Sequence, residues 1–250
     1  MNYGLYLSAA ALKLGHTRMD VLANNMANVN TTSFKPDALA VRSRPPAPTE
    51  RNLPPHLVMP VLDDIRGGLR DEGTFTDLSA GPLVSTGGQL DAAIQGDGFF
   101  AVEVDGQTRY TRDGRFARAA DGTLVTAAGG LPVLDDAGRR ITLGDGPVRI
   151  NGRGRIAAGG TVVQLGLTDF TNPRALRKAG ANTFAAGDAA GATASTATVR
   201  QGFIEGSGVE PTRALVNMLL AQRSYDAAAQ MIQHTDAMLG RAVNDIARLA

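Results

Sequence analysis

The sequence predicts a mainly β protein, in which a central all-β domain of hairpins is framed by long N- and C-terminal α-helices that pair as a coiled coil. Three observations lead to this fold class. Apolar residues recur every seven positions near both ends, glycine-punctuated apolar runs fill the middle, and prolines gather between the two. The expected divisions are an N-terminal helical segment over 1–35, an extended arm over 36–80, a β domain over 81–203 and a coiled-coil helix over 204–250.

The first amphipathic helix is expected from about Leu5 to Val29. Its apolar residues recur every seven positions, with others three positions later. The positions that define this stripe are Leu5, Leu12, Met19, Leu22 and Met26. Residues 28–33 are mostly short polar side chains that compete with helical hydrogen bonds, and Pro36 opposes continuation of the helix.

The arm is expected because six of the chain's 12 prolines lie between Pro45 and Pro60. Such a density favours extended, polyproline-like backbone. Two interpretations of this stretch remain open from the residues alone: an arm that lies over a partner, or a solvated loop.

The β domain is expected from its turns and its alternation. Asp-Gly, a pair that suits the positive φ angles of tight hairpins, occurs once every eight residues. These pairs begin at Asp97, Asp105, Asp113 and Asp121. Between the first two, Phe100, Val102 and Val104 give one strongly apolar face. The spacing predicts a meander of strand, turn and strand.

The last helix is expected from Pro211, which suits a first helical position, to Leu249. At about 1.5 Å per residue it would be roughly 58 Å long. Its heptad positions are Met218, Tyr225, Ile232, Leu239 and Ile246, and mostly small residues stand three after each: Ala221, Ala228, Thr235, Ala242 and Leu249. A helix of this length needs a partner, and the N-terminal helix is the candidate.

Charge and cysteine content exclude several function classes. Lys+Arg 25 against Asp+Glu 24 leaves a formal charge of +1, so no overall field favours nucleic acid. Cysteine is absent, which removes disulfides and thiolate chemistry. No apolar stretch is long enough to span a bilayer, and the N-terminus lacks the basic region of a cleaved signal peptide.

Three groups of residues imitate chemical sites, and each has a simpler explanation. The glycines around Arg153 lack the helix that a dinucleotide fingerprint requires, so turns are expected there. The three histidines are scattered, and the pairs Asp63-Asp64 and Asp135-Asp136 lack an accompanying nucleophile or base. We therefore expect no catalytic residue, no cofactor and no bound metal.

Both ends and the middle of the chain closely resemble the flagellar rod and hook proteins. Residues 22–35 match the N-terminal signature of that family, and the interior motifs follow in the family's order. The matching segments are Leu22–Lys35, Leu90–Phe100, Tyr110–Phe116, Gly122–Thr126, Glu205–Pro211 and Leu215–Tyr225. Gly208 departs from the family pattern, which usually has Asn there.

The resemblance implies a structural subunit of the bacterial flagellar basal-body rod, polymerising into the axial drive shaft needed for motility, and no enzyme. A proximal rod protein is favoured. The alternatives are a distal rod or hook-type axial protein, or a wall-binding or wall-hydrolysing accessory protein. The implied partners are copies of itself, other rod proteins and the flagellar type III export apparatus, with no nucleic acid, small-molecule substrate or transmembrane segment.

The implied location is the basal body, where the rod crosses the periplasm, reached by export without a cleaved signal peptide. Subunit contacts are expected along the two heptad stripes and in the Asn-rich signature. The predicted interface residues are Leu5, Leu12, Met19, Leu22, Asn24, Asn25, Met26 and Asn28 near the N-terminus, and Met218, Tyr225, Ile232, Leu239 and Ile246 near the C-terminus.

Overall fold

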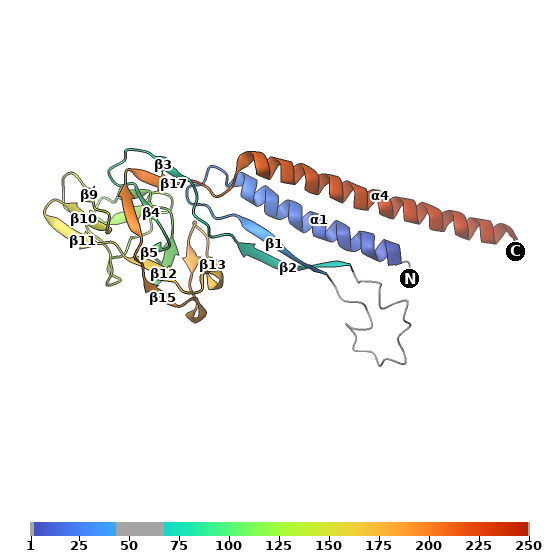
Figure 1. The fold of residues 1–250 in the computed structure, drawn as a ribbon, viewed down its shortest axis with the longest axis horizontal. Helices are drawn as coiled ribbons and strands as arrows, with labels where there is room; N and C mark the ends of the chain where they lie inside the picture. Colours follow the sequence, from blue (N-terminus) through green and yellow to red (C-terminus); the bar gives the residue numbers. More distant parts are fainter. Residues whose placement is uncertain (1–2, 44–67, 250) are drawn as a thin grey trace. The chain divides into compact units, whose positions relative to one another are not determined.

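The computed structural model describes residues 3–43 and 68–249, and its fold is mainly β with one helix near each end. The chain forms two compact units (Figure 1). Unit 1 comprises Met1–Ala27, Asp37–Thr76 and Glu210–Ala250, and unit 2 comprises Asn28–Pro36 and Asp77–Val209. The chain therefore passes between the units four times.

Unit 1 contains the two helices, α1 (Tyr3–Ala27) and α4 (Pro211–Leu249), which lie side by side and run in opposite directions (Figure 1). Helix α4 has the expected bounds. Helix α1 ends two residues before the expected Val29, because the chain turns after it: the Thr31 amide donates to the Asn28 carbonyl at 3.1 Å. The polar side chains of this stretch support the turn in place of another helical turn.

A two-stranded antiparallel ribbon, β1 (Asp37–Ser43) and β2 (Leu69–Thr76), completes the described part of unit 1 and contacts α1. The pairing runs from Asp37 opposite Thr76 to Ser43 opposite Leu69, with a bulge after Leu39. The flanks of the predicted extended arm are thus paired strands. The proline-rich stretch from Pro45 to Pro60 lies outside the described residues, so its role as an arm stays a prediction.

The largest sheet of unit 2 has the strand order β13-β14-β6-β5-β12-β15, and all of its neighbouring strands are antiparallel. Its strands are β5 (Phe99–Val104), β6 (Gln107–Thr111), β12 (Leu167–Phe170), β13 (Arg177–Lys178), β14 (Phe184–Ala185) and β15 (Ala192–Ala194).

Smaller antiparallel sheets surround it, in the orders β11-β10-β9, β16-β4, β17-β3 and β7-β8. Their strands are β3 (Leu83–Ser85), β4 (Ala92–Gln95), β7 (Phe116–Arg118), β8 (Leu124–Thr126), β9 (Arg149–Ile150), β10 (Arg155–Ala158), β11 (Thr161–Gln164), β16 (Thr198–Gln201) and β17 (Phe203–Glu205). Late strands pair with early ones, as β16 does with β4, so the unit is not the simple meander expected from the turns.

The four Asp-Gly pairs have different structural roles. Asp105 and Gly106 both have positive φ (50° and 73°) and form the two-residue hairpin turn between β5 and β6 that the sequence predicts. Gly122, at φ 83°, lies in the turn between β7 and β8. Gly98 and Gly114 serve close packing instead, because a Cβ on Gly114 would lie only 1.6 Å from the Ala92 carbonyl oxygen.

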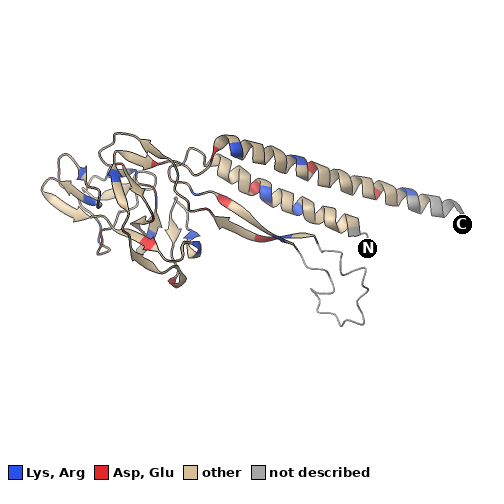
Figure 2. Ribbon diagram, viewed as in Figure 1, with Lys and Arg blue, Asp and Glu red and all other residues tan. Residues whose placement is uncertain are grey.

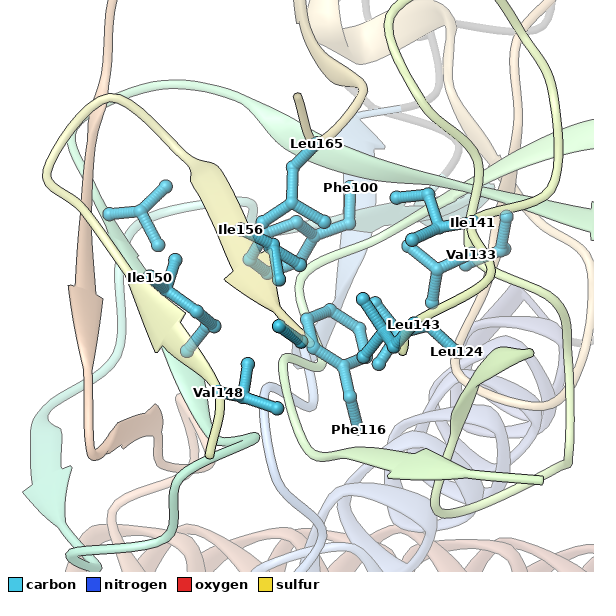
Figure 3. Close-up of a cluster of buried hydrophobic side chains, with 14 of the residues drawn as sticks. Phe100, Phe116, Leu124, Val133, Ile141, Leu143, Val148, Ile150, Ile156 and Leu165 are labelled. Atoms are coloured by element: carbon cyan, nitrogen blue, oxygen red, sulfur yellow. The ribbon is translucent and has the colours of Figure 1, made fainter. Parts of the chain in front are cut away.

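The core of unit 2 is a cluster of apolar side chains from these strands and their connections. Figure 3 shows them pointing toward one another, and they include the alternating residues Phe100 and Val102. Its buried members include Phe100, Phe116, Leu124, Val133, Ile141, Leu143, Ile156 and Leu165. The rings of Phe100 and Phe116 meet edge to face with their centroids 5.0 Å apart. A smaller cluster forms around Phe99, Phe170 and Phe184.

Candidate assembly site on the helices and the signature segment

Helices α1 and α4 face each other through small residues. Gly15 of α1 is buried, and a Cβ there would lie 3.4 Å from the Tyr225 ring of α4. On α4 the buried residues recur every seven positions: Ala214, Ala221 and Ala228. Small side chains at one layer let the helix backbones approach, while larger ones pack at the sides.

Most of the predicted heptad residues lie beside this small layer. Half-buried positions are Leu12, Met19, Leu22 and Met26 on α1 and Met218, Tyr225 and Ile232 on α4. Leu5 and Leu239 are 37% and 43% exposed, and the side chain of Ile246 lies outside the described residues.

The exposure of Leu239 follows from the register of the antiparallel pair. With Gly15 opposite Tyr225, equal rise along both helices brings Tyr3 level with about residue 237. The last turns of α4 therefore extend past the described start of α1 (Figure 1). Leu239 belongs to the α4 heptad, but the described part of α1 does not reach it.

The three predicted asparagines have different roles. Asn25 is buried and holds both backbone groups of Asp37: its Nδ2 donates to the Asp37 carbonyl at 2.8 Å, and its Oδ1 accepts from the Asp37 amide at 3.0 Å. This pairing fixes the start of β1 to the end of α1. Asn24 is exposed. Asn28 lies in unit 2, where its carbonyl accepts from the Ser207 hydroxyl at 3.0 Å.

A second apolar face runs along α4, separate from the one that faces α1. It consists of Val216, Leu220, Met231 and Met238, which are 49%, 51%, 58% and 61% exposed, and we name it the outer stripe. At about 100° per residue, its centre lies roughly a third of a turn from the Ala221 layer. Charged residues are sparse along the described part of α4 (Figure 2).

The signature segment that follows α1 is part of unit 2, and its lysine is buried. Lys35 is 1% exposed; its Nζ donates to Glu205 Oε1 and to the Ser79 carbonyl, each at 2.6 Å. Glu205, at the end of β17, is also 1% exposed, and its Oε1 accepts from the Gly81 amide at 2.7 Å. The guanidinium Nε of buried Arg112 lies 3.9 Å from Glu205 Oε2. We name Lys35, Arg112 and Glu205 the ion cluster.

Burial shapes the electrostatics of the ion cluster. Removal from water lowers the pKa of Lys35 and that of Arg112, and the negative charge of Glu205 opposes both shifts. Two cations thus share one buried carboxylate, although Asp77 near Lys35 and Asp97 and Asp169 near Arg112 also favour the charged forms.

Sequence reasoning missed the ion cluster, and it noted the small helix layer in the heptad without naming its residues as candidate contacts. A signal existed for the first, since Lys35 ends the N-terminal signature and Glu205 begins the C-terminal one. The second was visible as the small residues three after each heptad position. The prediction favoured large apolar residues because they bury more area. The closest contact between the helices depends instead on small residues, which let the backbones approach.

The groups that imitate chemical sites have structural partners. The carboxylate of Asp135 accepts from the Ala137 and Arg139 amides and from the Arg139 guanidinium, in the turn that the sequence predicts. Gly154, at φ 76°, lies in the turn between β9 and β10. His16 pairs with Asp20 at 2.9 Å on the surface of α1. Asp63-Asp64 and His56 lie outside the described residues.

Within residues 3–43 and 68–249, no cluster of three or more His, Asp or Glu side chains is arranged to hold a metal ion. An open hollow of about 680 Å³ lies beside β12 and β15, and Asp135 is among its lining residues. The hydrogen bonds just described already occupy that carboxylate. Neither described helix is long and apolar enough to cross a membrane.

Comparison with known families accounts for both helices and much of the β unit. The family described as "Flagella basal body rod protein" matches residues 5–35. "Flagellar hook protein FlgE/F/G D1 domain" matches 93–163, and "Flagellar basal body rod FlgEFG protein C-terminal" matches 200–245.

A protein named flagellar basal-body rod protein FlgF, from Caulobacter vibrioides, is 34% identical over 256 residues that cover 100% of both chains. The chain belongs to the flagellar basal-body rod proteins. Rod proteins named FlgG are similar to it as well: the one from Bacillus subtilis is 31% identical over 261 residues, covering 96% of this chain and 97% of the relative. The FlgG of Agrobacterium fabrum is 31% identical over 255 residues, covering 94% and 95%.

These relatives confirm the predicted membership of the rod and hook family and the predicted role as a structural subunit of the flagellar basal-body rod, which serves motility. The family is structural rather than enzymatic, assembles with other rod proteins and is located in the basal body.

Proposed function

We propose that this rod protein is a proximal rod subunit that polymerises with copies of itself as well as with other rod proteins, through helices α1 and α4. Its terminal heptads act as a coiled coil in the assembled rod. It leaves the cytoplasm through the flagellar type III export apparatus without cleavage of a leader, and it performs no catalysis. The contacts with other subunits are made by the outer stripe of α4 and by the predicted interface residues that stay exposed, Leu5, Asn24 and Leu239.

The observation that carries this proposal is the exposed apolar surface of α4. The outer stripe leaves four large side chains about half or more exposed, and Leu239 continues the heptad beyond the described part of α1. Full burial of a side chain such as Leu or Met stabilises by about 1.5–3 kcal/mol. A helix of a neighbouring subunit supplies that burial, and repetition in each subunit makes the gain large along a polymer.

Helix pairing within one chain buries only part of the apolar surface of α4. Helix α1 covers one face of α4 through Gly15 and the alanine layer, and isolated helices are marginal in water. A heptad seam with small residues at one layer suits further helices in lateral contact. This supports a coiled coil completed by assembly rather than within the monomer.

Leu220→Asp tests the proposal, because Leu220 lies in the centre of the outer stripe. We expect the variant to be lost from basal bodies and to abolish swimming, since a carboxylate placed in an apolar contact loses burial and adds an uncompensated charge. The melting transition of unit 2 should not change. The control is Gln233→Asp, which adds the same charge at an exposed α4 position outside both apolar faces.

Swimming, incorporation into basal bodies and thermal melting would be measured for both variants beside the wild type. If Leu220→Asp assembles and swims like the wild type while Gln233→Asp does too, the outer stripe is not a contact of the polymer. A loss in both variants would instead mean that any added charge on α4 is harmful, and the proposed contact would lose its support.

A further inference from the structure

The four passages of the chain between the units involve three short segments of unit 2. The passages follow Ala27, Pro36, Thr76 and Val209. The segments are 28–36, 77–82 and 205–209, and we name them the connector segments. Together they contain every residue at which the chain enters or leaves unit 2.

Each connector segment is hydrogen-bonded to the other two. Between 28–36 and 205–209, the Ser33 amide donates to the Glu205 carbonyl at 2.9 Å and the Gly208 amide donates to the Phe34 carbonyl at 2.9 Å. Between 28–36 and 77–82, the Asp77 amide donates to the Pro36 carbonyl at 2.8 Å.

Segment 205–209 is also bonded to 77–82, where the Gly206 amide donates to the Pro82 carbonyl at 2.7 Å. The ion cluster lies where the three segments meet. Lys35 contributes from the first segment and Glu205 from the third, and each also bonds the second segment, at Ser79 and Gly81.

Arg112 joins this centre to the body of unit 2. Its side chain donates to the Gly96 carbonyl at 2.8 Å, and its backbone carbonyl accepts from the Ser33 hydroxyl at 2.8 Å. Further anchors come from Asn182, whose side-chain amide donates to the Thr32 carbonyl, and from Lys178, whose Nζ donates to the Lys35 carbonyl.

A buried ion cluster is a costly way to join three segments, because each charge has lost its water. The lowered pKa of Lys35 expresses this cost. Apolar contacts tolerate sliding, whereas directional bonds to a buried charge are satisfied in one arrangement only. The best-supported benefit of buried charges in proteins is a unique geometry rather than a larger free energy of unfolding.

We propose that Lys35, Arg112 and Glu205 are positioning residues for rod assembly, which hold the three connector segments in one arrangement within unit 2. The places at which the chain leaves unit 2 toward α1 and α4 are thereby fixed relative to one another. This inference rests on the proposed function, since it takes assembly through the two helices as given. The partner it serves is another copy of a rod subunit, which requires the same geometry in each subunit.

The test compares Lys35→Met, which removes a charge of the cluster, with Val133→Ala, a truncation in the apolar core. Val133 is 0% exposed in the core cluster and belongs to none of the connector segments. Both variants would be made in the full chain. Thermal melting, amide hydrogen exchange and incorporation into basal bodies would be measured for each.

We expect Lys35→Met to raise hydrogen exchange in all three connector segments and to lose incorporation. Val133→Ala, with an equal or greater fall in melting temperature, should keep both close to wild type. If incorporation follows melting temperature in the two variants alike, or if Lys35→Met incorporates normally, the positioning role is refuted.

Ser207→Ala provides a second route should Lys35→Met fail to fold. It removes the hydroxyl that donates to the Asn28 carbonyl and leaves the buried charges in place. Reduced incorporation at unchanged melting temperature is the expected result, and normal incorporation counts against the proposal.

The Leu220→Asp variant separates the two proposals. If Leu220→Asp blocks assembly while Lys35→Met and Ser207→Ala assemble like the wild type, the positioning role fails and the proposed function stands. If Leu220→Asp assembles normally, the proposed function fails whatever the connector variants do.

Discussion

Glu205→Gln should be the most destabilising of the conservative changes in the ion cluster. Glutamine has the same shape, and its Oε1 can still accept from the Gly81 amide. The change removes the one carboxylate that contacts both Lys35 and Arg112 among the described residues. Two buried cations then remain within one cluster with no anion between them.

The magnitude follows from the burial and the distances. Glu205 and Lys35 are each 1% exposed and Arg112 is 3% exposed, so water cannot solvate the two cations once the carboxylate charge is lost. Removing one partner of a buried ion pair costs about 3–5 kcal/mol. Lys35→Met should cost less, about 1–3 kcal/mol, because Glu205 then keeps Arg112 as its counter-ion and the main loss is hydrogen bonding.

Urea denaturation of the purified full chain, followed by circular dichroism, would measure both values from the midpoint and slope of the transition. Glu103→Gln is the control, since Glu103 binds Arg140 bidentately at 2.7 Å on the surface and should shift the midpoint little. If Lys35→Met destabilises as much as Glu205→Gln or more, Arg112 does not compensate Glu205, and the account of the cluster is wrong.

Two other changes test the β unit. Gly114→Ala should destabilise the protein by about 3 kcal/mol or more, because the new Cβ would meet the Ala92 carbonyl oxygen. The control is Gly152→Ala, which should be nearly neutral because nothing lies within 4 Å of its Cβ. Thermal melting would compare the two variants, and similar melting temperatures would contradict the close packing at Gly114. Burial raises the pKa of Asp135, but hydrogen bonds from Arg139 outweigh it and hold the pKa below its usual 3.8. The charged Asp135 carboxylate therefore stabilises the fold above pH 3.8, and this stabilisation is lost as the pH falls through its folded pKa. The difference in the free energy of unfolding between wild type and Asp135→Asn should shrink in acid. A difference that grows in acid would refute this account of Asp135.

The helices could be predicted from the sequence because their signals are local. A heptad of apolar residues and a proline at the first helical position depend on neighbours a few residues away, and α4 has the expected bounds Pro211–Leu249. The Asp105-Gly106 hairpin is local in the same sense, since two positive φ angles are a property of the turn itself.

The sequence could not indicate which heptad residues would be covered or which Asp-Gly pair would form a turn, because both depend on the neighbouring elements. The heptad of α4 includes Leu239, yet the described part of the partner helix, which begins at Tyr3, does not reach it. Asp113-Gly114 has the same letters as Asp105-Gly106, but its glycine is required by the approach of β4 rather than by a turn. A pair of residues cannot indicate which of these constraints applies.

The sequence by itself determined that the fold is mainly β with a helix near each end, that cysteine chemistry is absent and that the chain resembles rod proteins, because composition, periodicity and motif order are readable along the chain. Only the tertiary structure decided that Lys35 and Glu205, which are 170 residues apart, form a buried ion pair. Long-range pairing of β17 with β3 brings Glu205 to that place, and the cost of burying either charge alone makes their meeting necessary. Such a contact depends on the whole path of the chain, which no local pattern specifies.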